Sequence, residues 1–267
     1  DLRCIARDIV EARRRKKPVI FMMGAHVIKC GLSPVVIDLI KRGIISCIAV
    51  NGAGMIHDFE IALIGSTSED VDCALKDGSF GMADETGRFI NNAIKIGAKK
   101  NIGMGRAIGD FISGEKDRFP YRDLSILYNC ALKGIPLTVH VGIGTDIIHQ
   151  HPSCDGSSVG KASLTDFYLL SEVVSKLEGG VVINFGSAVI LPEVFLKALN
   201  IARNLGFKVR DFTAADFDMI RHYRPSQNIV ARPTALGGRG YTITGHHEIM
   251  LPLLAAILIE ELYGDVK

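Results

Sequence analysis

Short apolar runs alternate with segments of helical periodicity along most of the chain, and this alternation limits the possible folds more than any other feature. The runs are short and continuously apolar, which is typical of strands buried on both faces. Strands of this kind, separated by helices, predict a parallel sheet with helices on both sides. The predicted strands are residues 17–24, 44–52, 135–142, 180–187, 207–216 and, less apolar, 238–245.

The intervening segments carry helix start and stop signals. In "SPVVIDLIKRG", Ser33 suits the N-cap, Pro34 the first turn and Gly43 the position after the last turn. No linker rich in Pro, Gly or Ser divides the chain, so we expect one doubly wound, mainly parallel Rossmann-like α/β domain over residues 1–267. Other helices are predicted at residues 55–64, 68–77, 82–98, 121–133, 163–180, 191–206 and 246–263.

The composition limits which kinds of binding partner and which cellular compartment we expect. The chain is 48% hydrophobic and 22% charged with a net charge of +2, which gives no reason to expect nucleic acid or an anionic membrane as partner. Six cysteines without a CxxC pair, several of them in apolar runs, favour reduced thiols. The longest apolar stretch, "IMLPLLAAILI", is short for a membrane span. We therefore expect a cytoplasmic protein that acts on a small molecule.

Small residues, acids and histidines gather where the predicted strands end. In "AVNGAGMIHDFE" an apolar run passes into residues 51–54, and "VGIGTDII" follows the third strand. Ligands of open α/β sheets bind beyond the carboxyl ends of the strands. There, bare backbone and helix N-termini suit phosphate, and carboxylates such as Asp146 and Asp218 suit ribose hydroxyls. The pattern predicts a dinucleotide site, although the GxGxxG spacing is incomplete and tight turns would explain any single glycine.

All eight histidines lie in or near these loops. His149 and His151, with Cys154 close by, have ligand chemistry for a metal, yet neither this pair nor the adjacent histidines before the last helix form a specific metal signature. We therefore expect no metal, and histidines that contact a substrate or a neighbouring subunit fit better. Cys154 and Cys30 have histidines nearby but no defined third partner, so cysteine catalysis is a weaker alternative.

In order and spacing, these loops resemble the deoxyhypusine synthase family across most of the chain. "NGAGMIHDFE" is similar to that family's Thr-Ala-Gly-Gly-Val-Glu-Glu-Asp loop and "FTAADFD" to its Thr-Ala-Gln-Glu-Phe-Asp, while "VGIGTDII", "EGGVVINFGSAV" and "HHEIMLPLLAA" match further motifs. The resemblance implies a Rossmann-like fold, bound NAD, and a homotetramer with active sites at subunit interfaces. The NAD contacts that it implies are Asn51, Gly52, Ala53, Asp146, Thr213, Ala214 and Asp218.

The catalytic half of the family pattern does not carry over. The family forms an imine on an enzyme lysine shortly after an Ala-Arg-Pro segment, whereas the matching stretch here has Ala231-Arg232-Pro233 and no lysine. Arginine cannot replace it, because its guanidinium stays protonated. Substrate-side acids of the family fall at histidines such as His57, which favours a neutral or anionic substrate over a polyamine.

We therefore expect an NAD-dependent transferase or oxidoreductase of altered chemistry, in which one histidine is the general base. Three alternatives stay open. The first is an aminobutyl transferase of the deoxyhypusine or homospermidine synthase type that uses another lysine, such as Lys29. The second is a non-catalytic nucleotide-binding oligomer, and the third is a metal-dependent hydrolase. The candidate catalytic residues are His57, His149, His151, His246 and Arg232.

Overall fold

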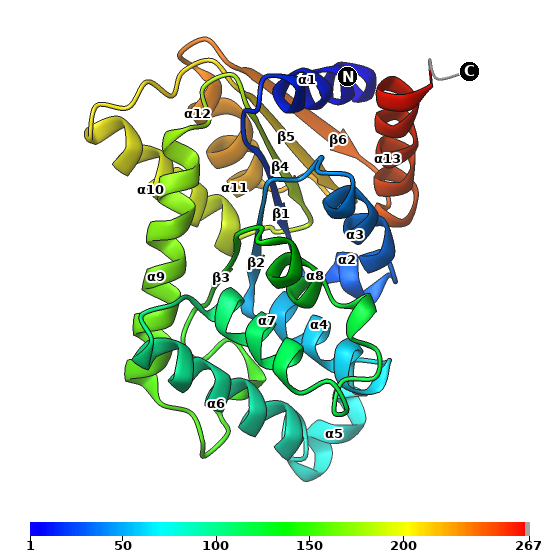
Figure 1. Cartoon of the computed structure of the whole chain (residues 1–267), viewed down its shortest axis with the longest axis vertical. Coiled ribbons are helices and arrows are strands. Elements are labelled where there is room, and N and C mark those ends of the chain that lie inside the picture. The colour runs from blue at the N-terminus through cyan, green and yellow to red at the C-terminus, as the bar shows by residue number, and fades with distance from the viewer. Residues whose placement is uncertain (265–267) are drawn as a thin grey trace.

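Six parallel strands form one sheet in the computed structural model, which describes residues 1–264 (Figure 1). The strand order is β3-β2-β1-β4-β5-β6, so the direction of progression along the sheet reverses between β1 and β4. This order confirms the predicted doubly wound, Rossmann-like α/β fold. The strands are β1 (Val19–Met23), β2 (Cys47–Asn51), β3 (Leu137–His140), β4 (Val181–Phe185), β5 (Thr213–Asp218) and β6 (Arg239–Thr244).

Helices surround the sheet on both faces (Figure 1). Within the described residues, no helix combines the length and the apolarity needed to cross a membrane. The helices are α1 (Leu2–Arg14), α2 (His26–Lys29), α3 (Ser33–Lys41), α4 (Gly52–Ile64), α5 (Val71–Asp77), α6 (Asp84–Lys99), α7 (Met104–Gly114), α8 (Ile126–Lys133), α9 (Gly156–Ser175), α10 (Ile190–Asn204), α11 (Tyr223–Pro225), α12 (Arg232–Thr234) and α13 (His247–Tyr263), with short helical turns η1 (Arg122–Leu124), η2 (Ile147–His149) and η3 (Ser226–Ala231).

Successive residues of the central strands point into two different cores. In β1, Phe21 and Met23 belong to the core that includes residues of α1, α3, α4 and α13. Ile20 and Met22 belong to the core on the other face, which includes residues of α9 and α10. Every residue of β1 is buried, and a strand buried on both faces needs an unbroken apolar run. This double burial is the reason that the central strands were recognisable in the sequence.

Helix α7 was not predicted, because its sequence "MGRAIGDFISG" contains glycines that weaken a helix. The structure explains them by close packing. A Cβ atom at Gly105 would lie 2.0 Å from the Leu137 carbonyl oxygen of β3, and one at Gly109 would lie 2.8 Å from the Leu127 carbonyl oxygen of α8. The glycines therefore allow α7 to approach the neighbouring backbones, which periodicity alone does not reveal.

The fifth strand was predicted too early in the chain. Residues 207–216 were expected to form it, with the site loop following, but β5 spans Thr213–Asp218. Thr213 is paired with Val181, the first residue of β4, so it lies at the amino end of the sheet, and Ala214 is buried beside it. Both were predicted to contact NAD at the carboxyl ends, and the structure corrects that placement. Thr213 donates instead to the Asp8 carboxylate of α1, at 2.7 Å.

Candidate functional site

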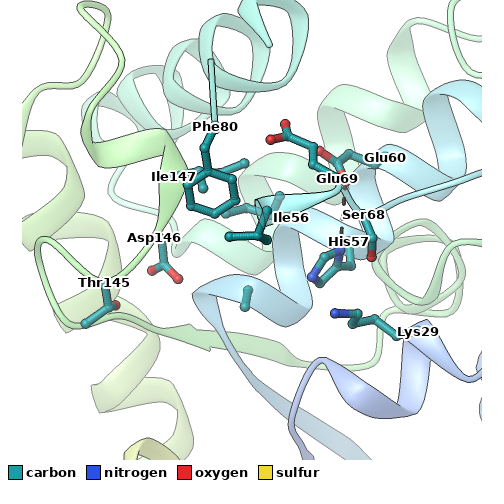
Figure 2. Close-up of a pocket in the computed structure, with 12 residues that line it drawn as sticks. Lys29, Ile56, His57, Glu60, Ser68, Glu69, Phe80, Thr145, Asp146 and Ile147 are labelled. Atoms are coloured by element: carbon teal, nitrogen blue, oxygen red, sulfur yellow. Dashed lines mark ion pairs between the residues drawn. The ribbon is translucent and has the colours of Figure 1, made fainter. Parts of the chain in front are cut away.

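A pocket of about 240 Å³ lies beyond the carboxyl ends of β2 and β3 (Figure 2). The start of α4 forms its floor, α2 and the loop after β3 form two sides, and the chain between α4 and α6 closes it. The location is the one that a parallel sheet predicts for ligands. The lining residues are Lys29, Ala53, Ile56, His57, Glu60, Ser68, Glu69, Val71, Phe80, Thr145, Asp146 and Ile147.

The start of α4 is shaped by two residues that the sequence assigned to a dinucleotide. Asn51 is the N-cap, and its side-chain oxygen accepts a hydrogen bond from Gly54 N–H at 2.8 Å. A Cβ atom at Gly52 would lie 2.0 Å from the Asp146 Oδ2 atom, so any larger residue would displace that carboxylate. The bare backbone at Gly52 therefore accommodates Asp146, which enters from the loop after β3.

Asp146 is half-buried and only partly satisfied. Its side chain and that of His149 cap η2 reciprocally, and the Asp146 N–H donates to His149 Nδ1 at 3.3 Å. Among the described residues, neither Asp146 Oδ2 nor His149 Nε2 has a hydrogen-bond partner. Burial raises the pKa of the Asp146 carboxyl to about 6, against the effect of a hydrogen bond from Thr145. An unpartnered, buried carboxylate oxygen at a pocket wall is suited to accept a hydrogen bond from a ligand.

His57 is held in one tautomer by a chain of hydrogen bonds. The Thr67 hydroxyl donates its single proton to Glu60 Oε2, so its oxygen accepts from His57 Nδ1, at 2.6 Å. Neutral His57 thus carries its proton on Nδ1 and leaves Nε2 as an acceptor. Burial lowers the pKa of His57; Glu60 acts in the opposite direction and Lys29 in the same one. His57 is therefore a neutral base with a free nitrogen at physiological pH.

Glu60 and Glu69 lie on the wall above His57 (Figure 2). Thr86 on α6 donates to Glu60 Oε1 at 3.2 Å, which fixes this carboxylate from the side away from Thr67. Glu69 Oε2 accepts from Gly81 N–H at 2.8 Å and so ties together the two ends of the segment around α5. Lys29 extends toward His57 from the opposite side (Figure 2). The pocket thus places acids on one wall and an ammonium on the other.

The structure separates the remaining predicted residues from this pocket. His151 bonds to Ser153 and to Asp84 of α6 and packs on Gly87. The predicted catalytic residues His246 and Arg232 are exposed: His246 is the residue before α13 and makes no side-chain capping bond, and Arg232 donates to Asn228 at 2.7 Å and to Tyr223 at 3.3 Å. Asp218 lies at the carboxyl end of β5, where Met219 N–H donates to it at 2.7 Å.

Of the predicted site residues, Ala53, His57 and Asp146 line the pocket. Asn51 and Gly52 lie beside it, and His149 positions the Asp146 loop. His151 lies on the same loop after β3 as Asp146 but bonds to Asp84 of α6 and does not line the pocket, whereas Arg232 and His246 lie on segments that follow β5 and β6. Residues 149 and 151 do not form a metal-ligand group in the part of the chain that the structure describes.

Sequence reasoning missed two acids of the pocket, Glu60 and Glu69, and named Lys29 only as a possible replacement for the family lysine. Glu60 follows His57 by three positions and so lies on the same face of α4, a spacing that was available in the sequence. Lys29 and Glu69 gave no such signal. They reach the pocket because α2 turns back after β1 and because the segment around α5 folds over α4, and both are tertiary effects.

Known proteins resemble this chain in structure only. No family model and no curated protein matches it. A proposed LOR/SDH protein from Methanococcus maripaludis S2 aligns with 98% of the chain at 18% identity and a TM-score of 0.62, and 69% of that protein is covered. AgrE in a ternary complex with ornithine and NAD+ aligns with 97% of the chain at 14% identity and a TM-score of 0.62. The chain spans 32% of AgrE.

A proposed deoxyhypusine synthase from Entamoeba histolytica aligns with 96% of the chain, at 9% identity and a TM-score of 0.52, and 85% of that protein is covered. At identities this low, the likenesses establish the shared α/β fold and leave substrate and reaction to be argued from the site. The fold resemblance that the loop motifs suggested is thus present, although weak, and other proteins of similar fold score higher.

Proposed function

We propose that the chain is an NAD-dependent enzyme that transfers a hydride to or from a small substrate bearing an ammonium group. The observation that carries the proposal is a pocket lined both by a neutral histidine with a free Nε2 and by Asp146, whose Oδ2 has no hydrogen-bond partner among the described residues. Support comes also from the fold shared with AgrE, whose structure contains ornithine and NAD+. Both lines fit an enzyme that binds a dinucleotide beyond its strand ends.

The residues beside α4 fit the ribose part of NAD. Asp146 Oδ2 is a buried acceptor without a partner among the described residues, and ribose hydroxyls are donors that would satisfy it. Ala53 at the second position of α4 keeps the approach open, and the helix N-terminus favours a nearby phosphate. The cofactor contacts carried forward are therefore Asn51, Gly52, Ala53 and Asp146, with Asp218 further along the sheet.

His57 supplies the proton transfer. When bound, NAD would supply a hydride acceptor for a substrate carbon, and its reduced form a hydride donor. His57 Nε2 accepts the proton of the hydroxyl or amino group on that carbon, while Thr67 holds the ring through Nδ1. Glu60, bonded to Thr67, then offsets the positive charge on protonated His57. The three residues thus orient the base and stabilise its charged form.

The charges of the pocket favour a substrate with an ammonium group. The family comparison favoured a neutral or anionic substrate, because several expected acids were absent. Glu60 and Glu69, which that comparison did not consider, give the pocket wall a negative charge. Lys29 across from them suits a carboxylate. An amino acid with a cationic side chain matches both walls.

Binding of NADH is expected to depend on Asp146. The change Asp146→Asn removes the charge while it keeps the size, and we expect affinity for NADH to fall about 10-fold or more, since a hydrogen bond to a charged group contributes about 1.5–3 kcal/mol. Calorimetry on dialysed protein measures this. The matched control is Asp110→Asn on α7, an exposed carboxylate paired with Arg106, which should leave affinity unchanged. Absence of NAD and NADH binding by the unaltered protein would contradict the proposed function.

Lys29 supports a second candidate function. Imine chemistry needs a lysine in the pocket, and Lys29 lines it although the family lysine is absent. In this alternative the Lys29 amine attacks the imine carbon of a substrate amine that NAD would oxidise, displaces the amine that this carbon carried, and later passes the bound group to another amine. Sodium borohydride with NAD and spermidine should then add an alkyl group to the Lys29 peptide, detected by mass spectrometry. Lys29→Arg should abolish the adduct and Lys41→Arg on α3 should not. If no adduct forms, the hypothesis of a transferase that uses Lys29 is wrong, and the proposal of NAD-dependent hydride transfer is unaffected.

The predicted homotetramer with sites at subunit interfaces stays a prediction. Lys29 is exposed on the single chain and also lines the pocket, so a subunit bound over Lys29 would contact the pocket. Light scattering on the purified chain measures the assembly. A monomer with full NADH affinity would remove the need for an interface in cofactor binding.

A further inference from the structure

Helix α2 lies near the start of α13 (Figure 1). Three side chains with metal-ligand atoms come together between these helices. His26 and Cys30 are four positions apart on α2 and its C-cap, and Cys30 Sγ lies 3.2 Å from His26 Nε2. Glu248 comes from the first turn of α13. The ligand atoms of all three lie within 4.8 Å of one another. This group is separate from the pocket that contains His57.

Buried neighbours hold the two helices in this arrangement. On α2, Val27 and Ile28 lie between His26 and Cys30 in the sequence and are 0% and 2% exposed. On α13, His247 precedes Glu248, is 1% exposed, and packs edge-on against the His26 ring with ring centroids 5.5 Å apart. Each of the three candidate ligands is thus next to, or one residue from, a side chain that is buried in the core. Because core packing fixes both backbones, the three donors stay close without a bound ion.

The donor set is that of zinc and similar ions. Thiolate, imidazole and carboxylate are the three ligand types that zinc uses, whereas magnesium and calcium prefer oxygen alone. Tetrahedral zinc, with Zn–S about 2.3 Å and Zn–N about 2.0 Å, places the two donor atoms about 3.5 Å apart. The present separation of 3.2 Å between Cys30 Sγ and His26 Nε2 needs only a small adjustment. Three protein ligands would leave a fourth position open to water or to a ligand.

A catalytic cysteine is the competing explanation, and the geometry favours it less. In a Cys-His-acid arrangement the acid should orient the histidine through its other ring nitrogen. Here Glu248 makes no hydrogen bond to the His26 ring among the described residues, and its carboxylate oxygen lies within 4.8 Å of both the Cys30 sulfur and the His26 nitrogen. The carboxylate, the thiol and the imidazole therefore converge on one point, as the ligands of a single metal ion do. We therefore propose that His26, Cys30 and Glu248 form a binding site for a divalent transition metal of the zinc type.

Metal titration of the full chain tests the site. After dialysis against EDTA, calorimetry should find one equivalent of Zn²⁺ bound per chain, and Co²⁺ should give a thiolate-to-cobalt charge-transfer band in the near ultraviolet. In Cys30→Ser the band should disappear and the Zn²⁺ affinity should fall about 100-fold or more, since outer-shell partners alone contribute about 10- to 100-fold. Glu248→Gln should weaken Zn²⁺ binding in the same direction and keep the cobalt–thiolate band.

Two control variants match these changes in residue type. Cys73→Ser removes an exposed cysteine on α5, and Glu261→Gln removes an exposed acid from α13 itself; both should bind Zn²⁺ and Co²⁺ like the unaltered chain. Circular dichroism of metal-free Cys30→Ser should equal that of the metal-free unaltered chain, because Cys30 is only partly buried. Unchanged Zn²⁺ affinity in both Cys30→Ser and Glu248→Gln, or no charge-transfer band with Co²⁺ in the unaltered chain, would overturn the proposal.

Discussion

Replacement of Asp166 by alanine is expected to lower the free energy of unfolding by about 3–5 kcal/mol, because two buried backbone N–H groups lose their acceptor. Asp166 lies on α9 and is fully buried. Its Oδ2 atom accepts from Gly105 N–H of α7 at 3.1 Å and from Val139 N–H of β3 at 2.9 Å. One carboxylate therefore joins three elements. Urea denaturation followed by circular dichroism measures the change.

Asparagine at the same position separates hydrogen bonding from charge. Burial raises the pKa of Asp166 to about 7, while the N–H groups of Val139 and Gly105 oppose the shift. A neutral Asp166 would keep its proton on Oδ1, which has no partner among residues 1–264, and would still accept through Oδ2. Asparagine has the same shape and one remaining acceptor oxygen. We therefore expect Asp166→Asn to cost much less than Asp166→Ala.

The pH dependence of stability follows from the same raised pKa. The folded chain binds the Asp166 proton more tightly than the unfolded chain, whose carboxyl has an ordinary pKa near 3.8. The contribution of Asp166 to the free energy of unfolding is therefore fully present below pH 4 and decreases as pH rises toward 7. Asp166→Asn should remove this part of the slope. Asp110→Ala, a change at an exposed carboxylate, should shift stability by less than about 0.5 kcal/mol. An equal loss in both alanine variants would refute the proposed role.

The fold was predictable from the sequence because burial on both faces leaves a direct trace. The runs that became β1, β2 and β4 are apolar at nearly every position, and no other common element of that length needs this pattern. The apolar pattern gave a wrong strand boundary where hydrogen bonds from another part of the chain decide the local structure. The segment before β5 is apolar in part, yet Glu178 accepts from Arg210 and Asp211 N–H groups there and replaces strand pairing with a loop. That the chain forms one domain stays a prediction.

The site was predictable at the strand ends and not beyond them. Asp146 and the start of α4 follow directly from parallel strands whose carboxyl ends meet at one edge. Histidines were assigned by their place in loops. His246 follows β6, at the edge of the sheet opposite β3, and His151, although its loop follows β3, bonds to Asp84 of α6 and does not line the pocket. Glu69 and Lys29 enter through segments that fold back over the sheet. The turn of α2 after β1 also brings His26 and Cys30 close to Glu248, which lies more than two hundred positions later in the chain.

The change His57→Gln is expected to lower kcat/KM by about 100- to 10,000-fold, which is the usual contribution of a positioned general base. The assay follows NADH formation, with NAD and a cationic amino acid such as ornithine as first probes. Glutamine fills a similar volume and still donates to Thr67, so NADH affinity should persist. His151→Gln is the matched control, because His151 bonds to Ser153 and Asp84 outside the pocket. An equal loss of activity in the control would return the catalytic role to the His149–His151 loop.

The change Glu60→Gln tests how His57 is tuned, even before a substrate is known. Burial lowers the pKa of His57 below its usual 6.5 and Glu60 acts against this shift, so loss of the Glu60 charge should lower the pKa further. Histidine NMR titration should show the resonance of His57 moving at lower pH in the variant. A general base loses activity as pH falls through its pKa, so the acid limb of kcat/KM should move to lower pH as well. A glutamine oxygen still accepts from Thr67, which keeps Nδ1 protonated in the variant. A shift toward higher pH would mean that Glu60 does not stabilise the charged ring, and the proposed base would lose its support.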